Sequence, residues 1–300
     1  MSDPIDRVAC IGTGTVGAGW AALFLARGYE VRAWDPAPDG EAAMRRAIER
    51  AWPALTRLGL SEGTSPDRIE FLPALDEAVG GAAFVQESAP DNEELKIELL
   101  SKIDAACDSQ AVIASSSSTF LPSRLAARCR YPQRIVVGHP FVPVYLVPLV
   151  EVVGGERTSE GALERAFEFY ASLGMAPLKL KREIEGYLAN RLQRALFEEA
   201  CSLVEAGVCD WDDVENAVTL GPGFRWPVVG PVLHRHLGGG LGGIRHMIEH
   251  FGWRGPEGGD KTLIDAVEKR WAGWTIEALA DRRDAQLLGI LQAMGRRETQ

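Results

Sequence analysis

The chain has 300 residues, 46% of them hydrophobic and 25% charged, and its formal net charge is −10 at pH 7. This composition is typical of a globular protein with about two domains and enough apolar material for a core. Because the balance is acidic and no dense block of Lys or Arg occurs, we exclude nucleic acid as an expected partner.

The cysteines and apolar runs indicate the compartment. The five cysteines are widely spaced and include no C-x-x-C pair, which argues against a disulfide framework or a thiolate metal site. The N-terminus has no basic signal-like segment, and the apolar stretch 141–150 is too short for a membrane span and contains two prolines. We therefore expect a cytoplasmic protein without a membrane partner.

The first motif is a glycine turn between a strand and a helix. Residues 7–11 predict a short buried strand, and 12–17 read Gly-Thr-Gly-Thr-Val-Gly. A helical pattern follows as far as Gly28, and a second strand at 30–35 ends in an aspartate. In this context the G-x-G-x-x-G spacing predicts a dinucleotide-binding unit.

Each glycine of the turn has an expected task. Gly12 permits the tight turn, Gly14 lets the backbone approach a pyrophosphate, and Gly17 lets the helix pack on the sheet. The helix N-terminus offers unpaired N–H groups to the same pyrophosphate. The remaining residues of the predicted cofactor-binding turn are Thr13, Thr15 and Val16.

Asp35 selects the dinucleotide. It lies 23 residues beyond Gly12, at the end of the second strand, where it is expected to accept hydrogen bonds from the adenine ribose hydroxyls. Pro36 and Ala37 follow it and offer no cation for a 2′-phosphate. The sequence therefore favours NAD as the cofactor over NADP.

Short strands and helices continue to alternate along the first half of the chain. A helix is expected at 40–58, and strands are expected at 69–72, 84–87 and 111–114. This alternation predicts an α/β fold with a doubly wound, mostly parallel sheet of the Rossmann type. Ligands of such sheets bind at the carboxyl ends of strands, where Glu87 and the serine run 115–118 are placed. Four serines can equally form a capping turn.

A histidine and a glutamate lie in two neighbouring apolar runs. His139 is near the end of the run 136–140, and Glu151 lies within the run 149–153, so both are expected on adjacent buried strands. An imidazole exchanges a proton near neutral pH, and a carboxylate fixes its tautomer and stabilises its cation. An isolated pair of this kind is more often structural, and the rest of the chain is what favours a catalytic role.

The second half of the chain changes character. A helix is expected at 159–173 and a strand at 176–180, after which the pattern is mostly helical. We therefore predict a cofactor domain at 1–184 and an all-helical domain at 185–300. An apolar stripe at helical spacing begins the second domain: Leu188, Leu192, Leu196 and Leu203. Because one small helical domain cannot bury this stripe alone, we expect a homodimer formed through it.

Further polar residues of the helical domain have two interpretations each. Asn190, near a helix start, is a capping residue or a substrate contact. Arg225, on a glycine-rich turn, is a partner for a substrate carboxylate or a solvated surface residue. His246 and His250 stand one helical turn apart, but no third ligand is identifiable, so no metal site is predicted.

Taken in order, the motifs resemble the 3-hydroxyacyl-CoA dehydrogenase family over nearly the whole chain. They are the glycine turn, Glu87-Ser88-Ala89-Pro90, the serine run, Gly138-His139-Pro140, 148–153 and 185–192. Stretches 138–148, 221–226 and 237–246 are most similar to one branch, which contains L-carnitine 3-dehydrogenase, L-gulonate 3-dehydrogenase (lambda-crystallin) and polyketide-tailoring ketoreductases.

The resemblance implies a Rossmann domain, a helical dimerisation domain, and NAD-dependent oxidation or reduction at carbon 3 of a substrate. It assigns His139 as the acid/base and Glu151 as its orienting partner. Ser118 and Asn190 become catalytic hydrogen-bonding groups that contact the substrate oxygen. Chemistry agrees, because removing a hydride and a proton from an alcohol needs one base and a few donors.

Two details refine the site that the resemblance implies. Glu87 is assigned to the nicotinamide side of the cofactor site, and Lys96 is assigned to cofactor binding. The family usually has asparagine three residues after the histidine, whereas this chain has Val142, which alters the substrate pocket.

The substrate is expected to be a small molecule that bears a carboxylate. Only six lysines occur, and residues 40–58 contain no lysine-rich tract of the kind expected to hold coenzyme A phosphates. A 3-hydroxyacyl-CoA dehydrogenase or polyketide ketoreductase remains an alternative, as does a non-catalytic, crystallin-like NAD-binding protein.

Overall fold

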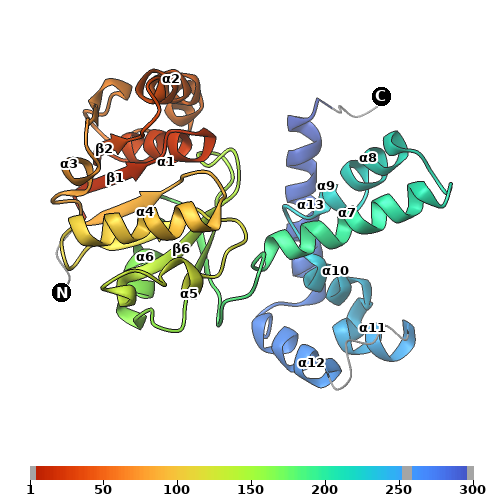
Figure 1. Ribbon diagram of the computed structural model, residues 1–300. Helices are drawn as coiled ribbons and strands as arrows, with labels where there is room; N and C mark the ends of the chain where they lie inside the picture. Colours follow the sequence, from red (N-terminus) through yellow and green to blue (C-terminus); the bar gives the residue numbers. More distant parts are fainter. Residues whose placement is uncertain (1–4, 252–258, 296–300) are drawn as a thin grey trace. The chain divides into compact units, whose positions relative to one another are not determined.

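The computed structural model describes residues 5–251 and 259–295, which Figure 1 shows as a sheet-containing part and a helical part. The chain divides into two compact units, residues 1–196 and 197–300. The division falls inside one helix, α7 (Ala189–Glu205), so a single element contributes to both units.

The first unit is built on an eight-stranded sheet with the strand order β3-β2-β1-β4-β5-β6-β7-β8. The strands are β1 (Arg7–Ile11), β2 (Glu30–Trp34), β3 (Ile69–Phe71), β4 (Phe84–Glu87), β5 (Val112–Ser115), β6 (Ile135–Pro140), β7 (Leu149–Gly154) and β8 (Ala176–Lys179). All neighbouring strands are parallel except β6 and β7, which are antiparallel. The predicted doubly wound, mostly parallel sheet is confirmed.

Helices cover both faces of this sheet. They are α1 (Thr15–Ala26), α2 (Gly40–Leu58), α3 (Leu75–Val79), α4 (Glu93–Ala106), α5 (Pro122–Leu125) and α6 (Glu160–Ser172). In β1, Val8 and Cys10 belong to the core with α1, α2 and α6, whereas Ala9 and Ile11 belong to the core with α3, α4 and α5. Alternate residues of a strand point to opposite faces, so a strand buried on both sides is apolar throughout.

Every secondary-structure element in the described residues of the second unit is a helix, as the sequence predicts. Besides the end of α7 it contains α8 (Trp211–Leu220), α9 (Pro222–Arg225), α10 (Pro231–Gly238), α11 (Gly243–Phe251), α12 (Gly259–Arg270) and α13 (Ile276–Ala293). Its buried apolar residues form two small clusters, one around Val229, Leu237 and Leu279 and one around Ile244, Ile248 and Val267. None of the helices in the described ranges is long and apolar enough to cross a membrane.

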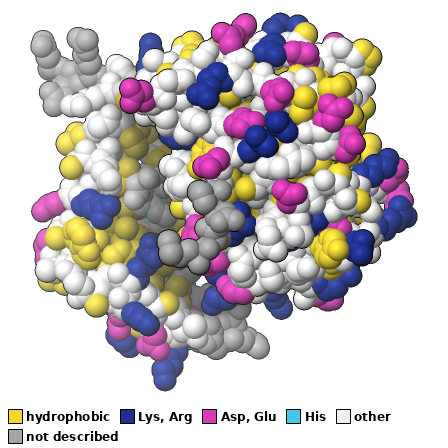
Figure 2. All heavy atoms as spheres, turned by 90° about the vertical axis from the view of Figure 1, so that its left-hand side faces the viewer, with side chains coloured by type: hydrophobic (Ala, Val, Ile, Leu, Met, Phe, Trp, Pro, Cys, Tyr) yellow, Lys and Arg dark blue, Asp and Glu magenta, His cyan; other side chains and the backbone are white. Residues whose placement is uncertain are grey.

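The surface mixes the two signs of charge. Figure 2 shows one face of the molecule, on which Lys and Arg side chains are interspersed with Asp and Glu. The described Lys and Arg side chains visible on this face are therefore balanced by neighbouring acidic side chains.

A buried polar chain ties the central strands to the helices of one face. The hydroxyl of Tyr170 in α6 donates to Gln86 Oε1 at 2.6 Å, and Gln86 Nε2 donates to Ser116 Oγ at 2.9 Å. The indole Nε1 of Trp20 donates to the same Ser116 Oγ at 3.2 Å. Gly138 lies against this chain, because a Cβ built on it would stand 1.9 Å from the Tyr170 hydroxyl oxygen.

We predict that Gly138→Ala destabilises the protein. The added methyl would displace Tyr170, which is completely buried, and overpacking of this kind costs about 1–3 kcal/mol. Gly161→Ala is the matched control, because Gly161 is exposed in α6 and a Cβ there meets no atom within 4 Å. Chemical denaturation should show a lower midpoint for Gly138→Ala alone, and equal midpoints would contradict the packing described here.

Candidate active site

The glycine turn at 12–17 joins β1 to α1 and leaves room for a ligand. Gly12 has a φ of 101°, and a Cβ on it would lie 2.6 Å from the carbonyl oxygen of Ser88. A Cβ on Gly17 would lie 2.0 Å from the carbonyl oxygen of Gly12, whereas one on Gly14 would meet nothing within 4 Å. Gly14 is the N-cap residue of α1, and no side chain caps the helix there. The first N–H groups of α1 therefore remain available to a ligand. The turn fits a pyrophosphate.

Asp35, directly after β2, is bound to this turn. Its Oδ2 accepts hydrogen bonds of 2.8 Å from both the backbone N and the Oγ1 of Thr13, and its Oδ1 accepts one of 2.8 Å from the backbone N of Ala37. A carboxylate has about four acceptor positions, so one remains for a ribose hydroxyl. The residues that follow Asp35 bring no cation to it, and the site fits NAD better than NADP.

Glu87, at the end of β4, forms a buried ion pair with Lys96 of α4. Lys96 Nζ lies 2.8 Å from Glu87 Oε1 and 3.0 Å from the carbonyl oxygen of Ala89. Glu87 also accepts a hydrogen bond of 2.6 Å from the backbone N of Ala89 and one from the Ser115 hydroxyl. Both charged side chains are almost completely buried, so these contacts fix the loop after β4 against the end of β5. Their predicted contact with the cofactor stays a prediction.

The serine run divides into a strand end and a loop. Ser115 is the last residue of β5 and is completely buried, whereas the expected strand ended one residue earlier. Ser117 Oγ accepts a hydrogen bond of 3.1 Å from the backbone N of Phe120. This bond fixes the loop 116–120, which we call the serine loop. The structure thus shows the turn that the sequence left open, whereas contact of the hydroxyls with a substrate stays a prediction.

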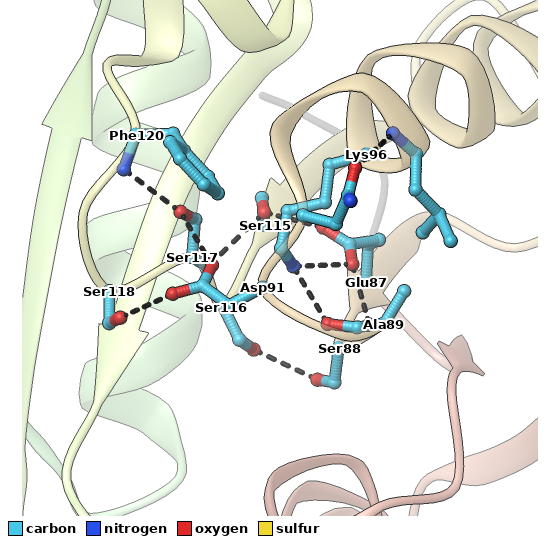
Figure 3. Close-up of polar contacts among 12 residues, drawn as sticks. Glu87, Ser88, Ala89, Asp91, Lys96, Ser115, Ser116, Ser117, Ser118 and Phe120 are labelled. Atoms are coloured by element: carbon cyan, nitrogen blue, oxygen red, sulfur yellow. Dashed lines mark hydrogen bonds and ion pairs between the residues drawn. The ribbon is translucent and has the colours of Figure 1, made fainter.

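Asp91 also belongs to the candidate active site, although nothing in the sequence pattern singled it out. Its Oδ2 accepts hydrogen bonds from Ser118 Oγ at 2.7 Å and Thr119 Oγ1 at 3.2 Å, and its Oδ1 accepts one from Ser117 Oγ at 3.4 Å. Figure 3 shows its carboxylate turned toward the serine loop, beside the Glu87 contacts. The signal that could have found it is position: an acid in the loop after a parallel strand lies at the ligand-binding edge.

His139 and Glu151 face each other across the antiparallel strands β6 and β7. They are direct partners in the register, and His139 Nδ1 lies 2.9 Å from Glu151 Oε2. His139 is 4% exposed and Glu151 is completely buried. With Nδ1–H donating to the carboxylate, Nε2 keeps its lone pair and has no hydrogen-bond partner among the described residues.

The second oxygen of Glu151 binds the start of α7. Oε1 accepts hydrogen bonds of 2.9 Å from the backbone N atoms of Leu188 and Ala189. Burial by itself raises the pKa of Glu151, but the hydrogen bonds from His139, Ala189 and Leu188 outweigh it, so the pKa is lowered from its ordinary value. Glu151 is therefore a carboxylate at neutral pH and holds the imidazole in one tautomer.

Asn190 is brought to the serine loop. Its Nδ2 donates to the backbone oxygen of Ser118 at 3.1 Å, and it is the second residue of α7, so the described contact links loop and helix. Ser118, Asn190 and the His139–Glu151 pair thus belong to one connected set of contacts in the first unit. Val142, where the resemblance implies asparagine, is 56% exposed.

Arg225 belongs to the second unit. Arg225 is the last residue of the short helix α9. The prediction that it lies on a glycine-rich turn is therefore wrong. Its Nε is buried and has no hydrogen-bond partner in the described structure. Burial, followed by the charges of Arg225 and two other arginines, lowers the pKa of His234, so positive charge is concentrated here.

A dinucleotide-binding turn in the same sheet as a histidine that can exchange one proton defines a nicotinamide-dependent dehydrogenase. The family model for the NAD-binding domain of 3-hydroxyacyl-CoA dehydrogenase matches residues 7–184, and the model for its C-terminal domain matches residues 186–273. The chain belongs to the 3-hydroxyacyl-CoA dehydrogenase family, its cofactor is NAD, and it is an oxidoreductase of 3-hydroxy compounds.

Relatives named L-carnitine dehydrogenase are similar to the chain over nearly its whole length. L-carnitine dehydrogenase of Streptomyces coelicolor is 48% identical, covering 99% of this chain and 98% of the relative. L-carnitine dehydrogenase of Pseudomonas putida is 44% identical, covering 97% and 94%.

Two solved structures share the fold. That of 5-formyl-3-hydroxy-2-methylpyridine 4-carboxylic acid 5-dehydrogenase, described as an NAD+-dependent dismutase, has a TM-score of 0.77 at 26% identity and covers 97% of this chain and 98% of its own. The 3-hydroxyacyl-CoA dehydrogenase of Archaeoglobus fulgidus has a TM-score of 0.72 at 22% identity, covering 96% and 99%, a likeness of fold alone.

We predict that Asp35→Ala narrows the preference for NAD over NADP. The change removes an acceptor for the ribose and a charge that repels a 2′-phosphate, and loss of one charge-assisted hydrogen bond weakens NAD binding by about tenfold. Fluorescence titration of both dinucleotides gives the ratio of dissociation constants. Asp39→Ala is the control, since Asp39 is exposed, makes no capping bond and changes the net charge equally. A native preference for NADP would contradict the prediction.

Proposed function

We propose that the protein interconverts a secondary alcohol and a ketone at carbon 3 of a small, carboxylate-bearing substrate, with His139 as the acid/base. The observation that carries the proposal is the His139–Glu151 pair, in which Nδ1 is held at 2.9 Å and Nε2 is left open. Relatives named L-carnitine dehydrogenase support a free small substrate. L-carnitine and L-gulonate are therefore the substrate types to test first.

In the proposed reaction His139 Nε2 takes the hydroxyl proton of the alcohol. Bound NAD supplies the acceptor for the hydride that leaves carbon 3. Glu151 stabilises the imidazolium that forms, and Ser118 and Asn190 hold the substrate oxygen. The reverse reaction begins with the protonated ring, which gives its proton to the ketone oxygen.

The loop after β4 supports this chemistry in the proposal. Glu87 and Lys96 hold the backbone at Ala89, and through this backbone they position Asp91. Asp91 Oδ2 accepts a hydrogen bond of 2.7 Å from the Ser118 hydroxyl. Ser118 oriented in this way presents its lone pairs, not its proton, to solvent. Because the one proton of the alcohol goes to His139 Nε2, we assign Ser118 to turn its hydroxyl from Asp91 and donate to the substrate oxygen. Asn190 and Glu87 with Lys96 are assigned to position the site.

Activity measurements separate this function from its alternatives. Purified protein is mixed with NAD or NADH and a panel of 3-hydroxy and 3-keto acids, together with the corresponding acyl thioesters, and nicotinamide absorbance is followed. Turnover of free acids supports the proposal. Turnover of thioesters alone would replace it with a thioester ketoreductase, and tight NAD binding without any turnover would favour a crystallin-like protein.

We further propose a cytoplasmic homodimer with a cofactor domain at 1–184 and a helical domain at 185–300. Support for the boundary comes from the two family models, which meet between residues 184 and 186. Five free thiols suit a reducing compartment. The helical stripe supports the dimer, because Leu188, Leu192 and Leu196 are 46%, 63% and 38% exposed.

We predict that His139→Gln lowers kcat for alcohol oxidation by about 10²–10⁴-fold, the usual contribution of general acid–base catalysis, while NAD affinity stays near native. Glu151→Gln should also lose activity, because it keeps the shape but removes the charge that orients the imidazole. The native oxidation rate should rise with pH, since only the neutral ring accepts a proton, and ketone reduction should fall.

The pH profile tests the same pair independently. Because the pKa of Glu151 is lowered, this carboxylate keeps its charge over the neutral range and contributes no second step there. Steady-state rates between pH 5 and 9 are measured for both directions. Native turnover in His139→Gln would show that another group carries the proton.

We predict a mass of about twice 32.6 kDa in light scattering at micromolar concentration. Leu192→Arg, at a position 63% exposed, should shift the protein toward a monomer, because a charge cannot be buried in an apolar interface without a partner. Leu58→Arg is the control, at a position 56% exposed on α2 of the first unit. A monomeric native protein would rule out the dimer.

A further inference from the structure

A cavity of about 300 Å³ lies beside the serine loop and is lined by three arginines. Arg124 belongs to α5, and Arg191 and Arg194 belong to α7, all within the first unit. Thr119 forms part of its wall, and Glu185 is the acidic residue of the lining. The lining therefore carries three positive charges against one negative charge.

The cavity begins next to the groups that are proposed to hold the substrate oxygen. Asn190 donates to the backbone oxygen of Ser118, and the residues that follow these two, Arg191 and Thr119, both line the cavity. Each of the two groups therefore has a chain neighbour in the wall of the basic cavity, although Ser118 and Asn190 themselves do not line it.

The three arginines differ in how far protein groups neutralise them. Arg124 lies 2.6 Å from Glu93 Oε2 and 4.0 Å from Glu185 Oε1, so its charge is compensated. Arg191 makes only a long contact of 3.5 Å with the backbone oxygen of Glu185. Arg194 makes no hydrogen bond or ion pair with the part of the chain that the structure describes. Arg191 and Arg194 are both exposed, so their guanidinium groups are available to an anion from solution.

The spacing of Arg191 and Arg194 also favours the binding of an anion. Arg191 and Arg194 stand three residues apart on α7, so they lie on the same face of the helix, where like charges are destabilising. An anion between them removes this repulsion, and a guanidinium binds a carboxylate with two parallel hydrogen bonds.

We propose that this cavity is the subsite for the carboxylate of the substrate, bound by Arg191 and Arg194. The inference deepens the proposed function and rests on it for the nature of the substrate. It gives the carboxylate a site in the first unit, on the helix that carries Asn190, whereas Arg225, assigned to a carboxylate from the sequence, belongs to the second unit.

The first test is binding without turnover. Calorimetry of the full chain with 3-hydroxybutyrate should show saturable binding, and Arg194→Gln should raise the dissociation constant about tenfold, the effect of losing one charge-assisted contact. Arg128→Gln is the matched control, because Arg128 is 56% exposed, pairs with Glu94 outside the cavity and changes the net charge equally. Gln keeps a good helix former at position 194, so folding should be retained.

Two further ligands identify the anion. The methyl ester of 3-hydroxybutyrate, which has no charge, should bind Arg194→Gln and the native protein equally weakly. Inorganic phosphate should bind less tightly than the acid. If phosphate binds in an Arg194-dependent way and the acid does not, the cavity is a phosphate site and the carboxylate assignment is wrong. An equal effect of Arg194→Gln and Arg128→Gln, or no saturable binding to the native protein, would also overturn it.

Kinetics connect the subsite to the reaction. For any free acid that is turned over, Arg194→Gln should raise KM about tenfold and leave kcat within about twofold, because the lost contact holds ground state and transition state alike. If no acid is turned over, the proposed function fails while the binding measurements still decide whether the subsite exists. If Arg225→Gln alone raises KM, the carboxylate is bound there and the inference fails.

Discussion

The hydrogen bonds of the buried Glu151 carboxylate hold the candidate active site of the first unit together. One oxygen binds His139 on the neighbouring strand, and the other accepts the backbone N–H groups of Leu188 and Ala189. A helix leaves its first N–H groups without intrahelical partners, and here a side chain of the sheet satisfies them. The same ion therefore orients the imidazole and anchors α7, so the histidine and Asn190 are positioned together.

This arrangement explains why the charge can remain buried. An isolated carboxylate without solvent would take up a proton, because burial raises its pKa. Three hydrogen bonds to Glu151 reverse that effect, and two of them come from backbone groups that cannot titrate. The carboxylate therefore keeps its charge at neutral pH, where it can orient the imidazole and stabilise its cation.

The sequence predicts best what depends on local pattern. The apolar runs around His139 and Glu151 fix two buried strands, and their direct pairing follows once the strands are neighbours. The glycine turn is equally local, because each of its constraints comes from backbone within the same strand–turn–helix unit or from the adjacent strand end. Helix α2 has the bounds that its periodicity predicts.

What the sequence could not predict depends on loops that meet only in the folded chain. Asp91 is one of many surface-type acids until three hydroxyls of the serine loop point at it. Lys96 reads as a helix-surface lysine, and only the path of the loop after β4 buries it against Glu87. The basic cavity likewise combines α5 and α7, more than 60 residues apart in sequence, and no local period links them.

Comparison of the three buried ion pairs in the described ranges separates two of them from the pair that is proposed to react. Arg134 donates from Nε and Nη2 to Asp104, and further bonds to backbone oxygens occupy its guanidinium. Lys96 divides its bonds between Glu87 and a carbonyl oxygen. In both pairs the described contacts of the cation are with oxygen atoms of the protein. His139 differs, because its cation exists only after a proton arrives and Nε2 is left open to deliver or accept it. Burial and pairing are common to all three, so the open, titratable nitrogen is the feature that assigns chemistry to this edge of the sheet.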